Sequence, residues 1–466
     1  MDQFPKLRPV GRLERCSTAR HHLGFYYNVA VAACYTLPKT FTLPIKDYVY
    51  KACETLIGQH PILTAVPIDE GTKEPYFARL PNVDLSQSVF FEKRKHNVPD
   101  VDDRDEELDT LLNTQHNIAF KLPLPSWRLI VLTDDADRTE REFTVVFVFH
   151  HAISDGTSGK VFHKSFLQAL QSMSSLTTDA VKEVIQSPDS PLLPPGEAVH
   201  PQPLSMSYLA IQLFKDKIYK PRDPGLWTGS EIRTPLETKV NHIVFPKHIS
   251  SAFKERCREN KTTITAALQT IFARSLFTHL PETFTKVQCN SPMSARRFLP
   301  DPITDDSMGV WVQEYTEQYA RKDLSDRSSF PWSEAVRSRA TIEKEISKEG
   351  GDSSVNLLKY VDDYHNKLYL SKIGQQRSST FEVSNLGAID LGPPVEGMPR
   401  IGRVIFSQSA SVTGNAIEVS VASGGDGCLV LAFVWQEGVV EELFMLSVIG
   451  SVRKEIYDLC GTDLID

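Results

Sequence analysis

Prolines concentrate in one long stretch near the middle of the chain. Within 187–229 they stand at positions 188, 191, 194, 195, 201, 203, 221 and 224. Because proline lacks a backbone donor and biases the residue before it toward extended conformations, this stretch favours neither a long helix nor a central strand. We expect a crossing connection in which only an apolar piece, 208–214, forms a short helix. The chain then divides into a first unit over 1–186 and a second over 230–466, with a seam between them of the kind where ligand sites are commonly built.

The composition is that of a folded protein and excludes several functions. Hydrophobic residues make up 41% and charged residues 24% of 466 residues, which argues against wholesale disorder. The net charge of −8 gives no general reason to bind nucleic acid or anionic lipid. Seven scattered cysteines without a C-x-x-C spacing favour a reducing, cytoplasmic location over a disulfide framework or zinc ribbon. No apolar run suggests a signal peptide or a transmembrane segment.

Helical and strand patterns occur in both halves and predict a mixed α/β (α+β) protein. Helical spacing is found over 44–57, 157–169, 262–276 and 441–459, with Thr157 or Ser158 as the expected N-cap of the second of these. Short β-rich runs predict strands at 127–132, 143–149, 416–421 and 428–435. A glycine-rich turn at 423–427 joins the last two.

The stretch with the clearest chemical content reads His-His-Ala-Ile-Ser-Asp-Gly at 150–156, between a predicted strand and a predicted helix. Gly156 suits a tight or left-handed turn that leaves the side chains at the strand's end in a cavity. A histidine held there in one tautomer can act as a base near neutral pH, and Asp155 can fix the loop through a buried ion pair.

Two other interpretations of these residues are open. A histidine beside a strand is often a satisfied polar group without any catalytic role. The second interpretation is a metal site with His150, His151, Asp155 and His163 as its ligands. Adjacent residues on an extended chain point to opposite faces, which disfavours one shared ion.

The HHxxxDG pattern at 150–156 resembles that of acyltransferases with the chloramphenicol acetyltransferase fold. This superfamily includes peptide-synthetase condensation domains, plant BAHD enzymes, polyketide-associated acyltransferases and fungal alcohol O-acetyltransferases. Further stretches of similarity follow in the expected order at 9–27, 60–63, 127–129, 292–299, 308–309 and 383–387. The DFGWG string of plant BAHD enzymes is absent and VSNLG stands at 383–387, which favours the fungal alcohol acetyltransferase branch. The resemblance implies two chloramphenicol-acetyltransferase-like subdomains, each a mixed sheet with flanking helices, and an active-site tunnel at their interface.

The resemblance also implies roles for individual residues. The second histidine of the pair, His151, is the general base, and His150 supports the loop. Asp155 is mainly structural and pairs with an arginine of the other unit, for which Arg296 and Arg297 are the two candidates. Gly156 keeps the loop clear of the acyl channel.

The expected reaction moves an acyl group, acetyl by resemblance, from a CoA thioester to a hydroxyl of a small-molecule acceptor. Neither a covalent acyl-enzyme nor a tightly bound cofactor or metal is expected. The candidate donors to the oxyanion are Asn385, Ser407, Ser409 and Ser411, although the serines also suit an ordinary strand face. Lys254, Arg256, Arg258 and Lys261 are the candidates for contact with the CoA phosphates, with a solvated helix face as the alternative.

Two other functions fit the same residues. The donor could be bound to an acyl-carrier protein, or the site could run another base-assisted step, such as a cyclisation, in secondary metabolism. A non-catalytic binding homologue is the second alternative, and the intact His151, Asp155 and Gly156 argue against it. A monomer is expected, because the two halves already supply each other with an interface.

Overall fold

The computed structural model describes residues 4–96, 104–133, 141–217, 223–326, 328–393 and 395–461. The strands are β1 (Lys6–Pro9), β2 (Val29–Leu37), β3 (Ala65–Ile68), β4 (Tyr76–Arg79), β5 (Asn82–Asp84), β6 (Val89–Lys93), β7 (Trp127–Thr133), β8 (Arg141–Phe149), β9 (Val184–Gln186), β10 (Thr238–Phe245), β11 (Lys286–Ser294), β12 (Val312–Ala320), β13 (Phe381–Ala388), β14 (Arg400–Gln408), β15 (Ile417–Ser423) and β16 (Leu429–Gln436). The helices are α1 (Arg12–His22), α2 (Ile45–Gln59), α3 (Glu106–Gln115), α4 (Gly156–Gln171), α5 (Gly196–Val199), α6 (Met206–Lys217), α7 (Lys247–Glu259), α8 (Ile264–His279), α9 (Arg321–Leu324), α10 (Trp332–Ile346) and α11 (Glu442–Cys460).

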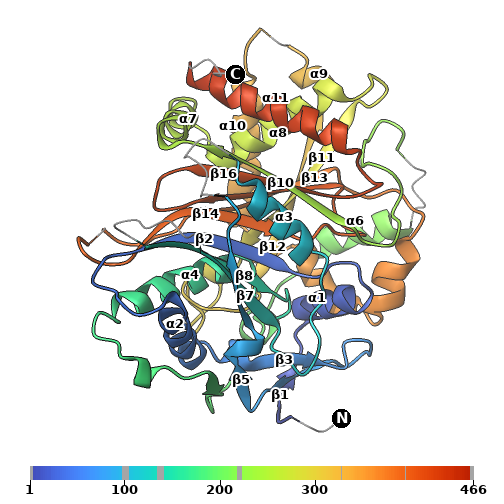
Figure 1. Cartoon of the computed structure of the whole chain (residues 1–466). Coiled ribbons are helices and arrows are strands. Elements are labelled where there is room, and N and C mark those ends of the chain that lie inside the picture. The colour runs from blue at the N-terminus through green and yellow to red at the C-terminus, as the bar shows by residue number, and fades with distance from the viewer. Residues whose placement is uncertain are drawn as a thin grey trace.

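Two large mixed sheets lie face to face, and helices cover their outer sides (Figure 1). The first sheet runs β14-β2-β8-β7-β6, and the second runs β10-β16-β15-β13-β11-β12. One apolar core joins the first sheet to α2 and α4, and another joins the second sheet to α7, α8, α10 and α11. A third core lies between the two sheets. The expected pair of mixed sheets with flanking helices is therefore confirmed.

The strands in the middle of the first sheet are apolar on both faces. In β2, Val29, Val31 and Ala33 face the helices, whereas Ala30 and Ala32 face the second sheet. Small alanines allow the two sheets to approach closely at this point, and burial of both faces explains why the strand sequences read as continuous apolar runs. The predicted strands at 127–132 and 143–149 are confirmed as β7 and β8.

Strand β14 does not follow the predicted division of the chain. It comes from the second half of the sequence, yet it pairs antiparallel with β2 and completes the edge of the first sheet. The unit predicted over 230–466 is therefore not self-contained. Strand exchange of this kind is fixed by pairing between segments that lie far apart in sequence, which periodicity within one segment does not encode.

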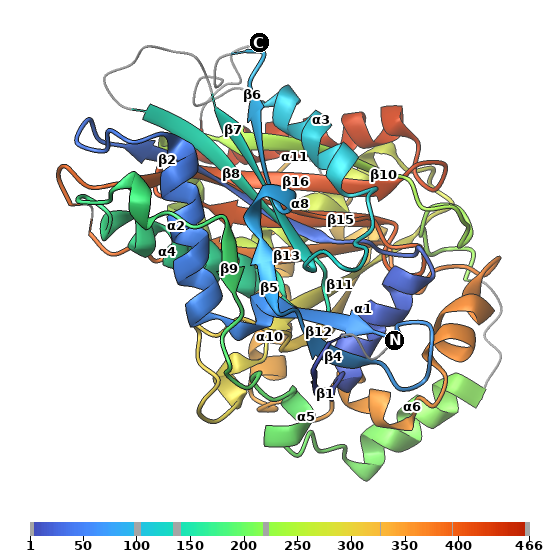
Figure 2. The ribbon, with the colours of Figure 1, turned by 60° about the horizontal axis from the view of Figure 1, so that its bottom comes forward.

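The proline-rich connection is partly helical and is packed against the domains. The helix expected at 208–214 is confirmed as α6, and a further short helix, α5, precedes it. Leu192 packs on the first core and Trp227 on the second. Figure 2 brings forward the small sheet β1-β4-β3, beside which α1 is held by the ion pair of Arg8 with Glu14. None of the helices in the described ranges combines the length and apolar character needed to span a bilayer.

Candidate active site

The HHxxxDG residues connect β8 to α4. After Phe149 the backbone N–H of His150 still donates to the carbonyl of Ser126 at 2.9 Å, so the pairing with the neighbouring segment continues one residue past β8. Helix α4 begins at Gly156, and Asp155 is its N-cap, because its carboxylate accepts from the N–H of Ser158 at 2.9 Å. The predicted cap at Thr157 or Ser158 was wrong. Asp155 is the cap because its carboxylate accepts a hydrogen bond from a backbone N–H of the first turn that has no partner within the helix.

Asp155 is bound to the second half of the chain through Arg296. The guanidinium donates to both carboxylate oxygens, at 2.8 and 2.9 Å, and both side chains are buried. The N–H of Trp311 adds a further bond to the carboxylate at 3.1 Å. Burial raises the pKa of Asp155, but Arg296 and these donors outweigh it, so the pKa is lowered. Of the two arginine candidates it is Arg296 that makes this pair, whereas Arg297 is exposed and lines the cavity described below.

His151 lies on the wall of a cavity of about 980 Å³ to which both halves of the chain contribute. Its Nδ1 is buried and has no hydrogen-bond partner among the described residues. Burial and the nearby charge of Arg20 lower the pKa of His151 to about 4, against the proton-favouring effect of its own carbonyl. The imidazole is therefore neutral at physiological pH, as a base must be.

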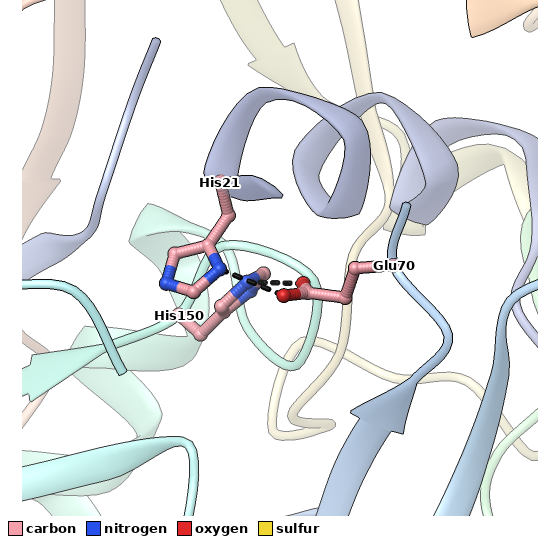
Figure 3. Close-up of side chains that lie close together, drawn as sticks. All are labelled: His21, Glu70 and His150. Carbon is pink, nitrogen blue, oxygen red and sulfur yellow. Dashed lines mark hydrogen bonds and ion pairs between the residues drawn. The ribbon is translucent and has the colours of Figure 1, made fainter. Parts of the chain in front are cut away.

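His150 points away from this cavity into a buried cluster that sequence analysis missed (Figure 3). Its Nε2 and the Nδ1 of His21 lie 2.9 and 2.8 Å from the two carboxylate oxygens of Glu70. The other ring nitrogens accept from backbone N–H groups, of Ala152 in one ring and of Phe120 in the other. The position of Glu70 in a loop far from the motif gave no signal in the sequence.

The tautomers decide what this cluster can hold. A ring nitrogen that accepts from an N–H carries no proton, so the protons of both neutral rings lie on the nitrogens that face Glu70. Those nitrogens are donors to the carboxylate and not metal ligands. Burial raises the pKa of Glu70, but His150 and His21 outweigh it and lower the pKa to about 2. The cluster therefore fixes the ring of His150.

The metal set considered from spacing does not come together. His163 is fully buried, where its Nε2 donates to the carbonyl of Val31 at 2.9 Å and its Nδ1 lies 2.8 Å from the hydroxyl of Tyr35. His150 binds Glu70, and Asp155 binds Arg296. Each of these side chains thus has its own partners on a different side of the loop.

Gly156 lies close to side chains that come from the second half of the chain. A Cβ at this position would come within 2.8 Å of a methyl carbon of Leu386 and 3.2 Å of the ring of Phe406. Its φ is not positive, so the predicted left-handed turn was wrong. The glycine lies in the first turn of α4 and lines the cavity.

Two of the four oxyanion candidates lie away from the cavity. Ser407 is buried against Nε2 of His116 at 2.7 Å, and Ser409 donates to the carbonyl of His116 at 3.0 Å. Both serines are fully buried and neither lines the cavity, so a substrate bound there does not reach them. Asn385 and Ser411 do line the cavity.

The cationic residues proposed for the CoA phosphates do not line the cavity either. Arg256 pairs with Glu259 and Arg258 with Glu255 on the exposed side of α7, as on an ordinary solvated helix, and Lys254 and Lys261 are exposed too. The cations that line the cavity on the side of α4 are Lys160, Lys164 and Arg297. They are spread over two segments, so no local cluster in the sequence marks them.

The chain matches known proteins over nearly its whole length. A family model described as alcohol acetyltransferase matches residues 9–448. The probable alcohol acetyltransferase crmB of Aspergillus fumigatus is 35% identical over 95% of this chain and 98% of its own length. The probable alcohol acetyltransferase FCK4 of Fusarium pseudograminearum is 26% identical over 93% of this chain and 91% of its own length.

Solved structures show the same fold. The trichothecene 15-O-acetyltransferase TRI3 of Fusarium sporotrichioides superposes with a TM-score of 0.73 at 13% identity, over 98% of this chain and 95% of that chain. The first condensation domain of the CDA synthetase gives 0.61 at 14% identity, over 97% and 96%. The protein is therefore an acyltransferase built on the chloramphenicol acetyltransferase fold. Within that class it belongs to the alcohol acetyltransferase family, as the family model and the relative at 35% identity show.

Proposed function

We propose that the protein transfers an acetyl group from acetyl-CoA to a hydroxyl of a small-molecule acceptor, with His151 as the general base. The observation that carries this proposal is the position of His151, an imidazole with a lowered pKa, on the wall of a cavity shared by both halves of the chain. The names of the relatives with an alcohol acetyltransferase description support the acceptor class and the acetyl group.

The chemistry needs one proton carrier. Nε2 of His151 takes the proton of the acceptor hydroxyl while the oxygen attacks the thioester carbonyl. The tetrahedral intermediate then collapses, the C–S bond breaks, and the imidazolium returns the proton to the departing thiolate. General-base assistance of this kind contributes about 10²–10⁴-fold to the rate.

Asp155 serves this step from a distance. Its carboxylate is saturated by Arg296, Ser158 and Trp311, so it has no free oxygen with which to bind substrate. The pair instead joins the loop of the first half to the segment that follows β11 in the second. That connection holds His151 at the seam, where donor and acceptor meet.

The remaining contacts to the substrates follow from the lining of the cavity. Asn385 is the candidate donor to the oxyanion, although in the free protein its Nδ2 donates to the hydroxyl of Thr265 at 3.0 Å. Lys164 and Arg297 lie on the same cavity and are suited to the CoA phosphates. The protein acts as a monomer and retains neither a cofactor nor a metal between turnovers.

The test is acceptor-dependent release of thiol. Purified protein is given acetyl-CoA, longer acyl-CoA thioesters or acetyl-pantetheine with a panel of alcohols, and both free thiol and the ester mass are followed. We expect acetyl-CoA to be consumed only when alcohol is present. Ester formation from the pantetheine thioester but not from CoA would instead support a carrier-bound donor, and no ester with any donor would refute the proposal.

A further inference from the structure

The face of the second sheet that looks toward the first sheet changes character from strand to strand. On β10 and β16 this face carries Val240 and Val434, which belong to the core between the sheets. Glu418 of β15 is the register partner of Val434, so it points to the same face. Where the two sheets no longer pack on each other, the inner face thus becomes polar.

The same tripeptide, Glu-Val-Ser, occurs in register on two neighbouring parallel strands. Residues 382–384 of β13 pair one by one with residues 418–420 of β15. The valines of both tripeptides point into the outer core beneath the helices. Because side chains alternate along a strand, the two glutamates and two serines gather on the opposite, inner face, with the glutamates about 5 Å apart at the backbone.

The two carboxyl groups differ in their hydrogen bonds. Glu382 accepts from Gln408 at 2.9 Å and from Asn415 at 3.2 Å. Glu418 is only 4% exposed, and its Oε2 has no partner among the described residues. The hydroxyl of Ser420, 1% exposed, is also without a partner in the described chain. A buried polar oxygen without a donor costs free energy, which suggests a site that another molecule completes.

This polar row belongs to the same cavity as His151. Glu382, Ser384 and Glu418 all line it. Gln408, which donates to Glu382, also accepts from the hydroxyl of Tyr26 at 3.1 Å, and the rings of Tyr26 and His151 are 5.8 Å apart. Hydrogen bonds therefore run from Glu382 through Gln408 to Tyr26, whose ring lies beside that of the base.

The charge around the row favours a neutral partner. Burial raises the pKa of Glu382, and burial together with the charge of Glu382 raises the pKa of Glu418. The pair therefore retains a proton near neutral pH, and the remaining negative charge is offset by Arg20, which lines the same cavity. A cation would gain little here, whereas a neutral O–H group can donate to the free oxygen of Glu418.

We propose that Glu382 and Glu418 form an acceptor subsite that selects alcohols with a second hydroxyl, which donates to Oε2 of Glu418 while the first hydroxyl lies at His151. The inference rests on the acetyl transfer proposed above for the hydroxyl at His151. It adds the acceptor class, a diol or larger polyol, and names the residue that determines specificity.

The test compares straight-chain alcohols from butanol to decanol with diols of the same length, hydroxylated at both ends. For wild-type protein we expect kcat/KM per hydroxyl to be about ten- to a hundredfold higher for the diol at the chain length that spans the two sites. Glu418→Leu should abolish this preference, so that a diol is used no better than the simple alcohol of the same length. Loss of a buried, incompletely bonded carboxyl does not threaten folding, so the variant should melt at or above the wild-type temperature.

Glu317→Gln is a control for the loss of a buried carboxylate elsewhere, because Glu317 has one unpartnered oxygen, pairs with Arg337 through the other and does not line the cavity. The diol preference should persist in this variant. Equal use of alcohols and diols by the wild type, or an undiminished preference in Glu418→Leu, would overturn the subsite and leave acetyl transfer intact. A binding measurement tests the subsite even if no acetyl transfer is found. The rise in melting temperature that the diols cause is measured for His151→Ala, which keeps the subsite, and for Glu418→Leu, which lacks it. If Glu418→Leu binds them as well as His151→Ala does, the subsite is refuted.

Discussion

Replacement of Asp155 by alanine should destabilise the protein severely. The substitution leaves the guanidinium of Arg296 buried at 2% exposure without its charge partner, with only neutral oxygens such as the carbonyl of Ser307 at 3.0 Å. Removal of one member of a buried ion pair costs about 3–5 kcal/mol. The lost N-cap of α4 adds about 1 kcal/mol. We therefore expect a loss of about 4–6 kcal/mol in the free energy of unfolding.

The assay is urea unfolding followed by tryptophan fluorescence and circular dichroism, arranged as a double-mutant cycle. Arg296→Met should also destabilise, because it leaves the carboxylate of Asp155 buried with only its neutral donors from Ser158 and Trp311. The double variant Asp155→Ala/Arg296→Met should lose clearly less than the sum of the two single changes. A single variant within about 1 kcal/mol of the wild type, or simple additivity, would refute the view that this pair joins the two halves.

Three further outcomes are expected. Glu70→Ala leaves the ring N–H groups of His21 and His150 without an acceptor, so urea unfolding should show a loss of about 1–3 kcal/mol for each ring, and added zinc should not restore it. Because the pKa of His151 is lowered to about 4, kcat/KM should stay level as pH falls through 6.5 and be lost only as the base becomes protonated nearer 4; a half-loss at the ordinary histidine value would contradict this. Neutralising Lys164 and Arg297 together should raise the KM for acetyl-CoA several-fold, whereas the matched change of Arg256 and Arg258 on α7 should not, and the reverse pattern would place the phosphates on α7.

Much of the local structure followed from the sequence. The strand at 143–149, the helix after it and the paired strands near the C-terminus have strong periodic patterns, and each lies within a few residues of its predicted position. The N-cap of α4 was placed two or three residues too late, because the carboxylate of Asp155 was assigned only to an ion pair. In the structure it both caps the helix and binds Arg296.

Contacts between distant segments were not predictable in the same way. β14 pairs with β2, which lies more than 350 residues earlier in the sequence. This pairing forms only when both halves of the chain are folded against each other. Glu70 reaches His150 across 80 residues of sequence, and the register of β13 with β15 brings Glu382 beside Glu418. The basic residues on and just after α7 stood out in the sequence because they lie within a few positions of one another. Closeness in sequence does not show that they face the cavity. The arginines among them have acidic partners one turn away on the helix.

The role of His151 is tested most directly by the rate of ester formation at neutral pH in His151→Ala, with His150→Ala as the neighbouring control. We expect a fall of about 10²–10⁴-fold in kcat for His151→Ala at an unchanged melting temperature. His150→Ala, which loses its bond to Glu70, should instead lower the melting temperature and retain most of the rate. A His151→Ala variant that forms ester at a rate close to that of the wild type would show that His151 is not the base.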